Sequence, residues 1–122
     1  MIIDLKSEIP IYEQIVRQVI LEIDRGELKA GEMLPSVRQL AQEIGINLHT
    51  VNKSYQILKA KGYVEIDRRR GVYIREDFSK MDEVVLKERE AELRYWIADF
   101  KNRGMSMEEI RLFLIGSCAD PF

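Results

Sequence analysis

Cysteine and histidine are almost absent from this sequence, which has one of each, Cys118 and His49. A single cysteine cannot form a disulfide within the chain, which suits a reducing compartment. One thiol and one imidazole are too few for a transition-metal cluster, and no glycine-rich phosphate loop accompanies them. We therefore expect no metal, no cofactor and no catalysis, with Cys118 a buried or unreactive thiol and His49 on an exposed helix face.

Long apolar runs are also lacking, since none approaches the roughly 18 residues that span a bilayer. The first ten residues have neither the basic start nor the apolar core of a signal peptide. These two absences predict a cytoplasmic protein with no membrane partner. The composition is ordinary, with 46% hydrophobic and 33% charged residues, and 122 residues suit one compact domain or a small domain with an appendage.

An overall excess of positive charge is missing too, because the formal net charge is −2. Local concentration of charge, rather than the total, sets the interaction with phosphate. Residues 44–75 hold seven basic and two acidic side chains, a local charge of +5, whereas residues 1–33 hold four basic and seven acidic ones, a charge of −3. Positive charge is thus gathered on one stretch of an acidic chain.

The segment before that stretch predicts one helix and a loop. Pro10 suits the first turn of a helix, where its missing N–H is no loss. Apolar residues then recur every four positions from Ile11 to Ile23, and Gly26 is a plausible stop. Residues 26–35 contain two glycines and a proline and predict a loop, with a short strand at 33–34.

Two further helices follow with almost no connection between them. Ser36 and Gln39 form a capping box that opens the first helix, and Gly45 ends it. Asn47 is a good N-cap for the second helix, which Gly62 closes. Helices joined so tightly must turn sharply, as in a helix-turn-helix.

The second of these helices has one apolar and one polar face. Its predicted buried residues are Val51, Tyr55 and Leu58. Its opposite face presents His49, Asn52, Lys53 and Gln56. Such side chains can hydrogen-bond base edges and pair with phosphates. The alternative is that any solvated helix face is polar.

Residues 63–66 and 72–74 then predict a two-stranded hairpin, which we call the wing. Alternation places Val64, Ile66, Val72 and Ile74 on its inner side. Arg68, Arg69 and Arg70 occupy the tip, where Gly71 turns the chain back. Three like charges repel one another unless an anion such as DNA phosphate relieves them. The alternative, a solubilising turn, usually mixes signs of charge.

After Arg75 a polar run predicts a hinge, and helix resumes at about Met81. A stop at Gly104 and a capping box at Ser106 and Glu109 predict a second helix. Apolar side chains form a seam along these helices: Leu86, Leu93, Trp96, Ile97, Phe100 and Phe113. Two helices alone cannot cover such a seam, so we expect it to pack on a second copy of the chain. Alternatively, Trp96 and Phe100 line a ligand pocket.

The segments LPSVRQLAQEIGINLHTV, LKAKGYVEI and RRRGVYI resemble the winged-helix domain of the GntR family of bacterial transcription regulators. The lead-in from Pro10 to Ser36 resembles it as well, so the likeness covers about residues 9–74. The short tail resembles the YtrA-like subfamily, in which two helices mediate dimerisation. The resemblance implies a mainly α fold with a small β wing. It places a winged helix-turn-helix in residues 1–77 and a helical dimerisation hairpin in residues 78–122.

The resemblance also implies roles for individual residues. Arg38 stands in the P-S-x-R motif and would contact phosphate or a base, and the Thr50 hydroxyl would hold a phosphate. The residues expected to contact DNA are Ser36, Arg38, Asn47, His49, Thr50, Asn52, Lys53, Gln56, Arg68, Arg69, Arg70 and Gly71. Many relatives carry arginine where this chain has Leu48 and Asn52, so we expect Asn52 to recognise adenine or a different operator.

The sequence therefore predicts a sequence-specific regulator, a repressor, that binds a palindromic operator in double-stranded DNA as a homodimer. The residues identify no effector ligand. The alternative function is a winged-helix protein interaction module whose basic face meets an acidic protein.

Overall fold

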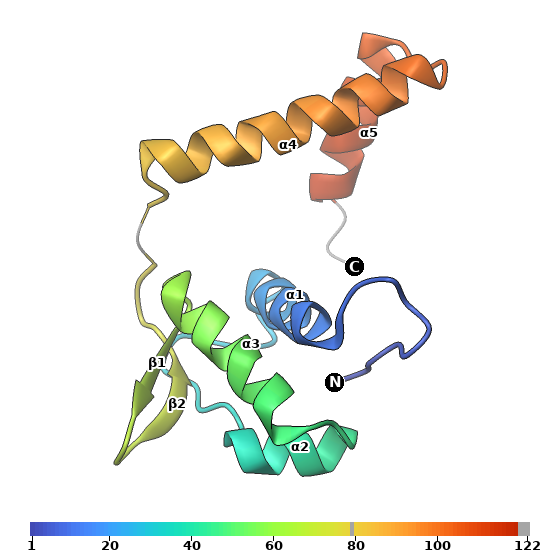
Figure 1. Ribbon diagram of the computed structural model, residues 1–122. Coiled ribbons are helices and arrows are strands. Elements are labelled where there is room, and N and C mark those ends of the chain that lie inside the picture. The colour runs from blue at the N-terminus through green and yellow to red at the C-terminus, as the bar shows by residue number, and fades with distance from the viewer. Residues whose placement is uncertain (79, 120–122) are drawn as a thin grey trace. The chain divides into compact units, whose positions relative to one another are not determined.

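A computed structural model describes residues 1–78 and 80–119 of the chain. It divides into two compact units, Met1–Ser79 and Lys80–Phe122 (Figure 1). The predicted hinge includes Ser79 and the predicted tail includes residues 120–122, which lie outside the described residues. The assignment of the first unit to DNA and the second to dimerisation remains a prediction.

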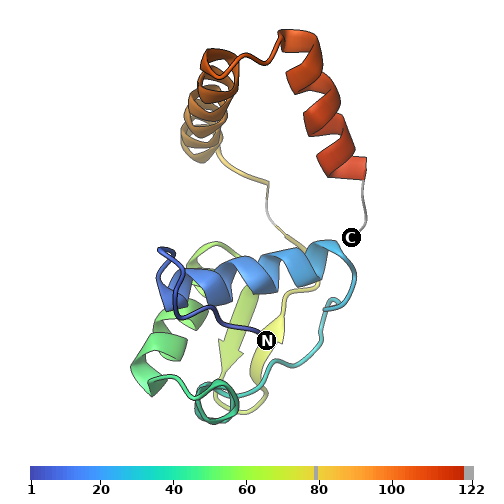
Figure 2. The same ribbon diagram turned by 90° about the vertical axis from the view of Figure 1, so that its right-hand side faces the viewer.

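The first unit contains three helices and a hairpin. Its elements are α1 (Ile11–Asp24), α2 (Val37–Ile44), α3 (Leu48–Ala60), β1 (Val64–Asp67) and β2 (Gly71–Ile74). Helix α3 packs against α1, α2 and β1, so it lies at the centre of the unit (Figures 1 and 2). The predicted winged helix-turn-helix with mainly helical content is confirmed.

The tight turn between α2 and α3 is built from local caps, as predicted. The Ser36 Oγ accepts from the Gln39 amide at 3.0 Å, and the Gln39 side chain accepts from the Ser36 amide at 2.9 Å. Gly45 ends α2 in the left-handed region at φ 67°, where a Cβ would be strained. The Asn47 Oδ1 then accepts from the His49 amide at 2.8 Å and opens α3. The chain turns over three residues, 45–47, because each helix end is satisfied locally.

The wing is an antiparallel pair in which Ile66 lies opposite Val72. The predicted strand at 33–34 forms only as an isolated bridge between Met33 and Tyr73, so β1 is a free edge. Val72 and the two residues of the Val64–Ile74 pair are buried, but Ile66 is 36% exposed. Ile66 shares the inner face with its direct partner Val72, as predicted, but it is not covered there, because it sits near the tip of the wing.

The core of the first unit gathers apolar side chains from every element. Its buried members are Ile15, Val16, Val19, Leu40, Ala41, Val51, Tyr55, Leu58, Val64, Val72 and Ile74. Tyr55 is 1% exposed, and its hydroxyl donates to the Pro35 carbonyl at 2.7 Å. Burial, helped by the charge of Glu43, raises the pKa of Tyr55, so the phenol stays protonated and remains a donor. This bond ties α3 to the chain that enters α2.

Gln14 is a buried polar residue that the apolar stripe of α1 did not reveal. Its side chain exchanges two hydrogen bonds with the backbone of Asp4, at 2.8 and 2.9 Å, and donates to the Ile9 carbonyl at 2.8 Å. Gln18 likewise bonds the backbone of Ile2. The N-terminal segment is thus held against α1 through two amide side chains.

The second unit is a helical hairpin of α4 (Glu83–Asn102) and α5 (Met107–Ala119). Asp82 caps α4, since its Oδ1 accepts from the Val85 amide at 2.9 Å. The predicted capping box of α5 is confirmed, with Ser106 and Glu109 bonded reciprocally at 3.1 Å. Cys118 is exposed, so the alternative of a buried thiol is wrong. Within residues 1–78 and 80–119, no helix is long and apolar enough to cross a membrane.

We predict that Tyr55→Phe lowers the free energy of unfolding by about 1–2 kcal/mol, because the Pro35 carbonyl loses its partner in a partly buried site. Urea unfolding at one fixed protein concentration measures the change. Tyr95→Phe, on a ring that is 65% exposed, is the matched control and should change stability little. Equal effects of the two variants would contradict the structural role of this bond.

Candidate nucleic-acid interface

The exposed face of α3 gathers four of the predicted DNA-contacting residues. His49, Asn52, Lys53 and Gln56 are all exposed. The opposite side of the helix is sealed, with Val51 and Leu58 at 0% exposure. Burial of one side therefore leaves a single polar surface, as the helical period requires. Contact of that surface with DNA remains a prediction.

Lys53 has a partner that the sequence did not reveal. Its Nζ lies 3.8 Å from the centroid of the Tyr12 ring on α1. The next residue, Ser54, is fully buried, and its hydroxyl lies 3.0 Å from the Tyr12 carbonyl and 3.1 Å from the Thr50 carbonyl of its own helix, so one proton serves two acceptors. The two contacts with Tyr12 join residues about forty positions apart in the sequence, so they depend on how α1 and α3 pack.

The start of α2 contributes Ser36 and Arg38, both exposed. The Ser36 Oγ already accepts a capping bond, so its hydroxyl proton is what it offers to a phosphate. Asn47 is similar, because its Oδ1 already caps α3 and only its side-chain amide nitrogen is left to donate a hydrogen bond. Thr50 is half-buried near the start of α3, more enclosed than the other helix residues of the predicted set.

The tip of the wing is held in shape by Asp67. Its Oδ1 accepts from the backbone amides of Arg69, at 2.7 Å, and Arg70, at 3.4 Å. These two bonds lower the pKa of Asp67, which keeps the carboxylate charged within the turn. Gly71 completes the turn at φ 89°, and a Cβ there would meet the Met33 side chain at 3.1 Å. Glycine is therefore favoured by the backbone conformation, whereas a Cβ would require only a small shift of the Met33 methyl group.

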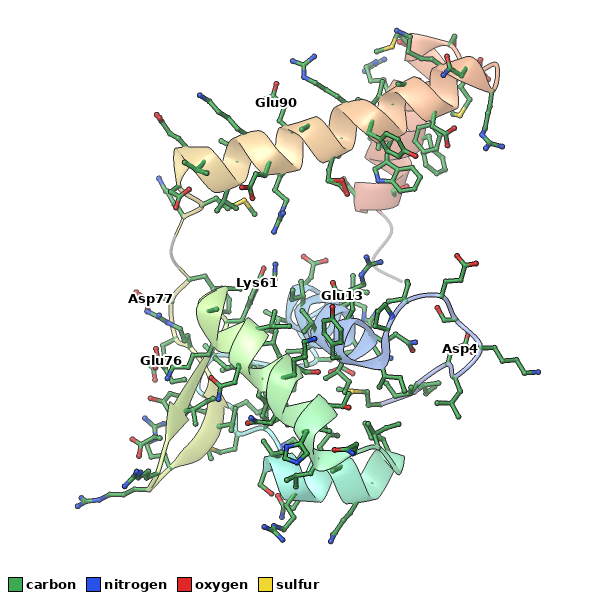
Figure 3. All side chains as sticks on the ribbon, in the orientation of Figure 1. Asp4, Glu13, Lys61, Glu76, Asp77 and Glu90 are labelled. Atoms are coloured by element: carbon green, nitrogen blue, oxygen red, sulfur yellow. The ribbon has the colours of Figure 1, made fainter. Side chains whose placement is uncertain are left out.

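The arginines at this tip are all exposed, and Figure 3 shows nitrogen-ended side chains extending from the hairpin on the side away from the helices. The acidic Glu76 and Asp77 lie at the other end of the hairpin (Figure 3). The Arg70 guanidinium lies over an aromatic ring, with its Cζ 4.0 Å from the centroid of Tyr73. Tyr73 was missed by the sequence analysis, although strand alternation places it on the outer face between buried Val72 and Ile74.

The interface thus brings together the start of α2, the outer face of α3 and the wing within one compact unit. Its chemistry is cationic and hydrogen-bonding, which is what phosphates and base edges require. Among the described residues, no group of three or more histidine, cysteine, aspartate or glutamate side chains could hold a metal ion.

Comparisons with known proteins agree with this geometry. The sequence model of bacterial regulatory proteins, gntR family, matches residues 11–74. The HTH-type transcriptional repressor YtrA of Bacillus subtilis (strain 168) is 36% identical over 97% of this chain and 92% of its own length. A transcriptional antiterminator from Listeria monocytogenes EGD-e is 32% identical with a TM-score of 0.89, over 99% of this chain and 91% of that chain. YtrA from Sulfolobus acidocaldarius, a GntR-family transcription factor, is 36% identical with a TM-score of 0.58, over 96% and 95%.

We predict that the carboxyl group of Asp67 titrates below its ordinary pKa of 3.8 in the folded protein. The turn is therefore stabilised by the charged form above that pH, and the stabilisation is lost as the pH falls through the lowered pKa. A carbon-detected NMR titration measures the midpoint, with the urea-unfolded chain as reference. A midpoint equal to or above that of the unfolded chain would show that the two amide bonds do not form in solution.

Proposed function

This chain belongs to the gntR family of bacterial regulatory proteins and is a transcription regulator with a DNA-binding winged helix, and from this premise we propose that it represses transcription as a homodimer on a palindromic operator. The single observation that carries the proposal is the joint placement of the polar α3 face and the arginine-tipped wing on one unit. A helix of this kind enters the major groove, and an arginine tip suits the adjacent minor groove.

Each part of the interface has a distinct task in this proposal. Arg38, Thr50 and the wing arginines contact phosphates and set the register of the protein on the duplex. Asn52 and Gln56 offer amide groups to base edges, where a bidentate contact with adenine is the favoured pairing. The acidic remainder of the chain does not oppose this, because it is concentrated outside the contacting surface.

The homodimer is supported by the apolar seam of the second unit. Leu86, Leu93, Trp96 and Phe113 are each at least half exposed within one chain. Phe100 packs its ring edge-to-face on Phe113 at 5.6 Å, which joins the parts of the seam on α4 and α5. Large apolar patches of this kind mark interfaces, and a two-fold partner covers the same patch on both chains. Two winged helices then face two half-sites.

Repression is supported by the name of the Bacillus subtilis relative, a repressor matched along nearly its whole length. Occupancy of an operator is sufficient to block transcription. We expect no enzymatic activity and no cofactor.

We predict that Arg38→Ala weakens binding and reduces the dependence of log affinity on log salt by about one, because one phosphate contact is lost. Replacing Arg68, Arg69 and Arg70 with glutamine should reduce it by up to about three. Fluorescence anisotropy with a duplex selected by this protein from random DNA measures both effects.

Arg94→Ala is the matched control, since this arginine is exposed on α4 and pairs with Glu90 at 2.8 Å. It should leave the salt dependence unchanged. A scrambled duplex separates specific from non-specific binding. Equal affinity for selected and scrambled DNA, or full binding after the wing is neutralised, would contradict the proposed function.

We predict that Trp96→Glu converts the homodimer into a monomer, because dimerisation would bury an unpaired carboxylate in the apolar seam at a large cost in free energy. Light scattering after size exclusion measures the mass. Affinity for a full operator should fall by roughly two orders of magnitude, because a monomer binds one half-site and no longer holds a linked domain near the second. Ala91→Glu adds the same charge on another face of α4 and should preserve the dimer. A wild-type protein that is monomeric at micromolar concentration would refute this assembly.

A further inference from the structure

Two tyrosine rings outside the predicted DNA-contacting set each carry a basic side chain of that set on one face. Arg70 lies 4.0 Å from the centroid of Tyr73, and Lys53 lies 3.8 Å from the centroid of Tyr12. Both distances are well within the roughly 6 Å over which the ring quadrupole attracts a cation. The same contact therefore occurs on the wing and on α3.

We propose that Tyr73 and Tyr12 are positioning residues that hold Arg70 and Lys53 in the orientation in which they meet DNA. The proposal rests on the DNA binding proposed above. Long basic side chains lose much rotamer freedom when they are fixed on a phosphate. A side chain already held on a ring loses less of that freedom on binding, so the complex is tighter for the same contact.

On the wing, the backbone on both sides of the stack is fixed. Tyr73 pairs with Glu65 on one side and bridges to Met33 on the other. The Asp67 carboxylate binds the Arg70 amide and so sets where the arginine leaves the turn. In the described part of the chain, the Arg68 and Arg69 side chains have no ion pair or ring contact. Arg70 is thus the arginine of the three whose direction is set before DNA arrives.

On α3, the register of the stack is fixed by the residue that follows Lys53. The buried Ser54 hydroxyl lies 3.0 Å from the Tyr12 carbonyl, which brings the neighbouring Lys53 beside the Tyr12 ring. Helix α1 thereby contributes the Tyr12 ring that lies against Lys53 of the interface. Tyr12 is half-buried, which makes its orientation part of the helix packing.

Binding measurements on double-mutant cycles test the proposal, with the selected duplex as probe. The wing cycle uses Tyr73→Ile, which suits a strand, Arg70→Ala and the double variant. The α3 cycle uses Tyr12→Leu, Lys53→Ala and the double variant. Each ring deletion should weaken binding about two- to fivefold. The ring deletion should not weaken binding further in a protein whose basic partner is already alanine. Tyr73→Phe should bind like the wild type because it keeps the ring.

Crossed pairs are the matched control, since Tyr73 with Lys53 and Tyr12 with Arg70 share no contact and should be additive within about twofold. Relaxation of the Arg70 Nε, measured by NMR in the free protein, should show more motion in Tyr73→Ile but not in Tyr73→Phe. This readout separates positioning from general loss of structure.

Additive cycles, or unchanged Arg70 motion in Tyr73→Ile, would overturn the proposal. Tighter binding by the ring-deletion variants would also overturn it, because the rings would then sequester the basic groups. Failure of the proposed function is distinguishable, since the wild-type protein would then show no preference for the selected duplex over a scrambled one.

Discussion

The packing of α3 is the constraint on which the rest of the interface depends. One side of this helix is buried against α1, α2 and β1, so the other, polar side is the one exposed to solvent. The Tyr55 hydroxyl donates to the Pro35 carbonyl in the segment that leads into α2, and the Ser54 hydroxyl lies within hydrogen-bonding distance of the Tyr12 carbonyl on α1. A shift of α3 would leave the buried Tyr55 hydroxyl without its partner, which costs free energy. The start of α2 and the wing are therefore held in a fixed relation to the exposed face.

Electrostatics in this protein is a matter of placement rather than total charge. The chain is acidic overall, yet the tip of the wing presents three arginines. Asp67 directly precedes them in the sequence, and its carboxylate accepts hydrogen bonds from two backbone amides of the turn. It shapes the basic tip and still carries one negative charge, which interacts with Arg70, so three positive charges at the tip face one negative charge. The Asp67 carboxylate thus holds the turn while the tip keeps a net positive charge.

The second unit depends on a different principle. Its caps and ion pairs satisfy the helices locally, but its large apolar side chains are mostly uncovered within one chain. Among the described residues of this unit, Ile110 alone is fully buried. One buried side chain leaves most of the apolar seam exposed. The proposed homodimer would cover these exposed apolar side chains.

Local chemistry determined much of this protein from sequence alone. The capping boxes, the Asn47 cap and the glycine stops act over two to four residues, so pattern was sufficient to place five helices and the hairpin turn. Helical and strand periodicity likewise identified the buried faces and the polar face of α3. What tertiary structure decided were contacts across long stretches of chain: Gln14 with the N-terminal segment, Tyr12 with Lys53, and Ile66 left exposed on a free edge. Periodicity says which face a residue occupies, but only packing decides what lies opposite it.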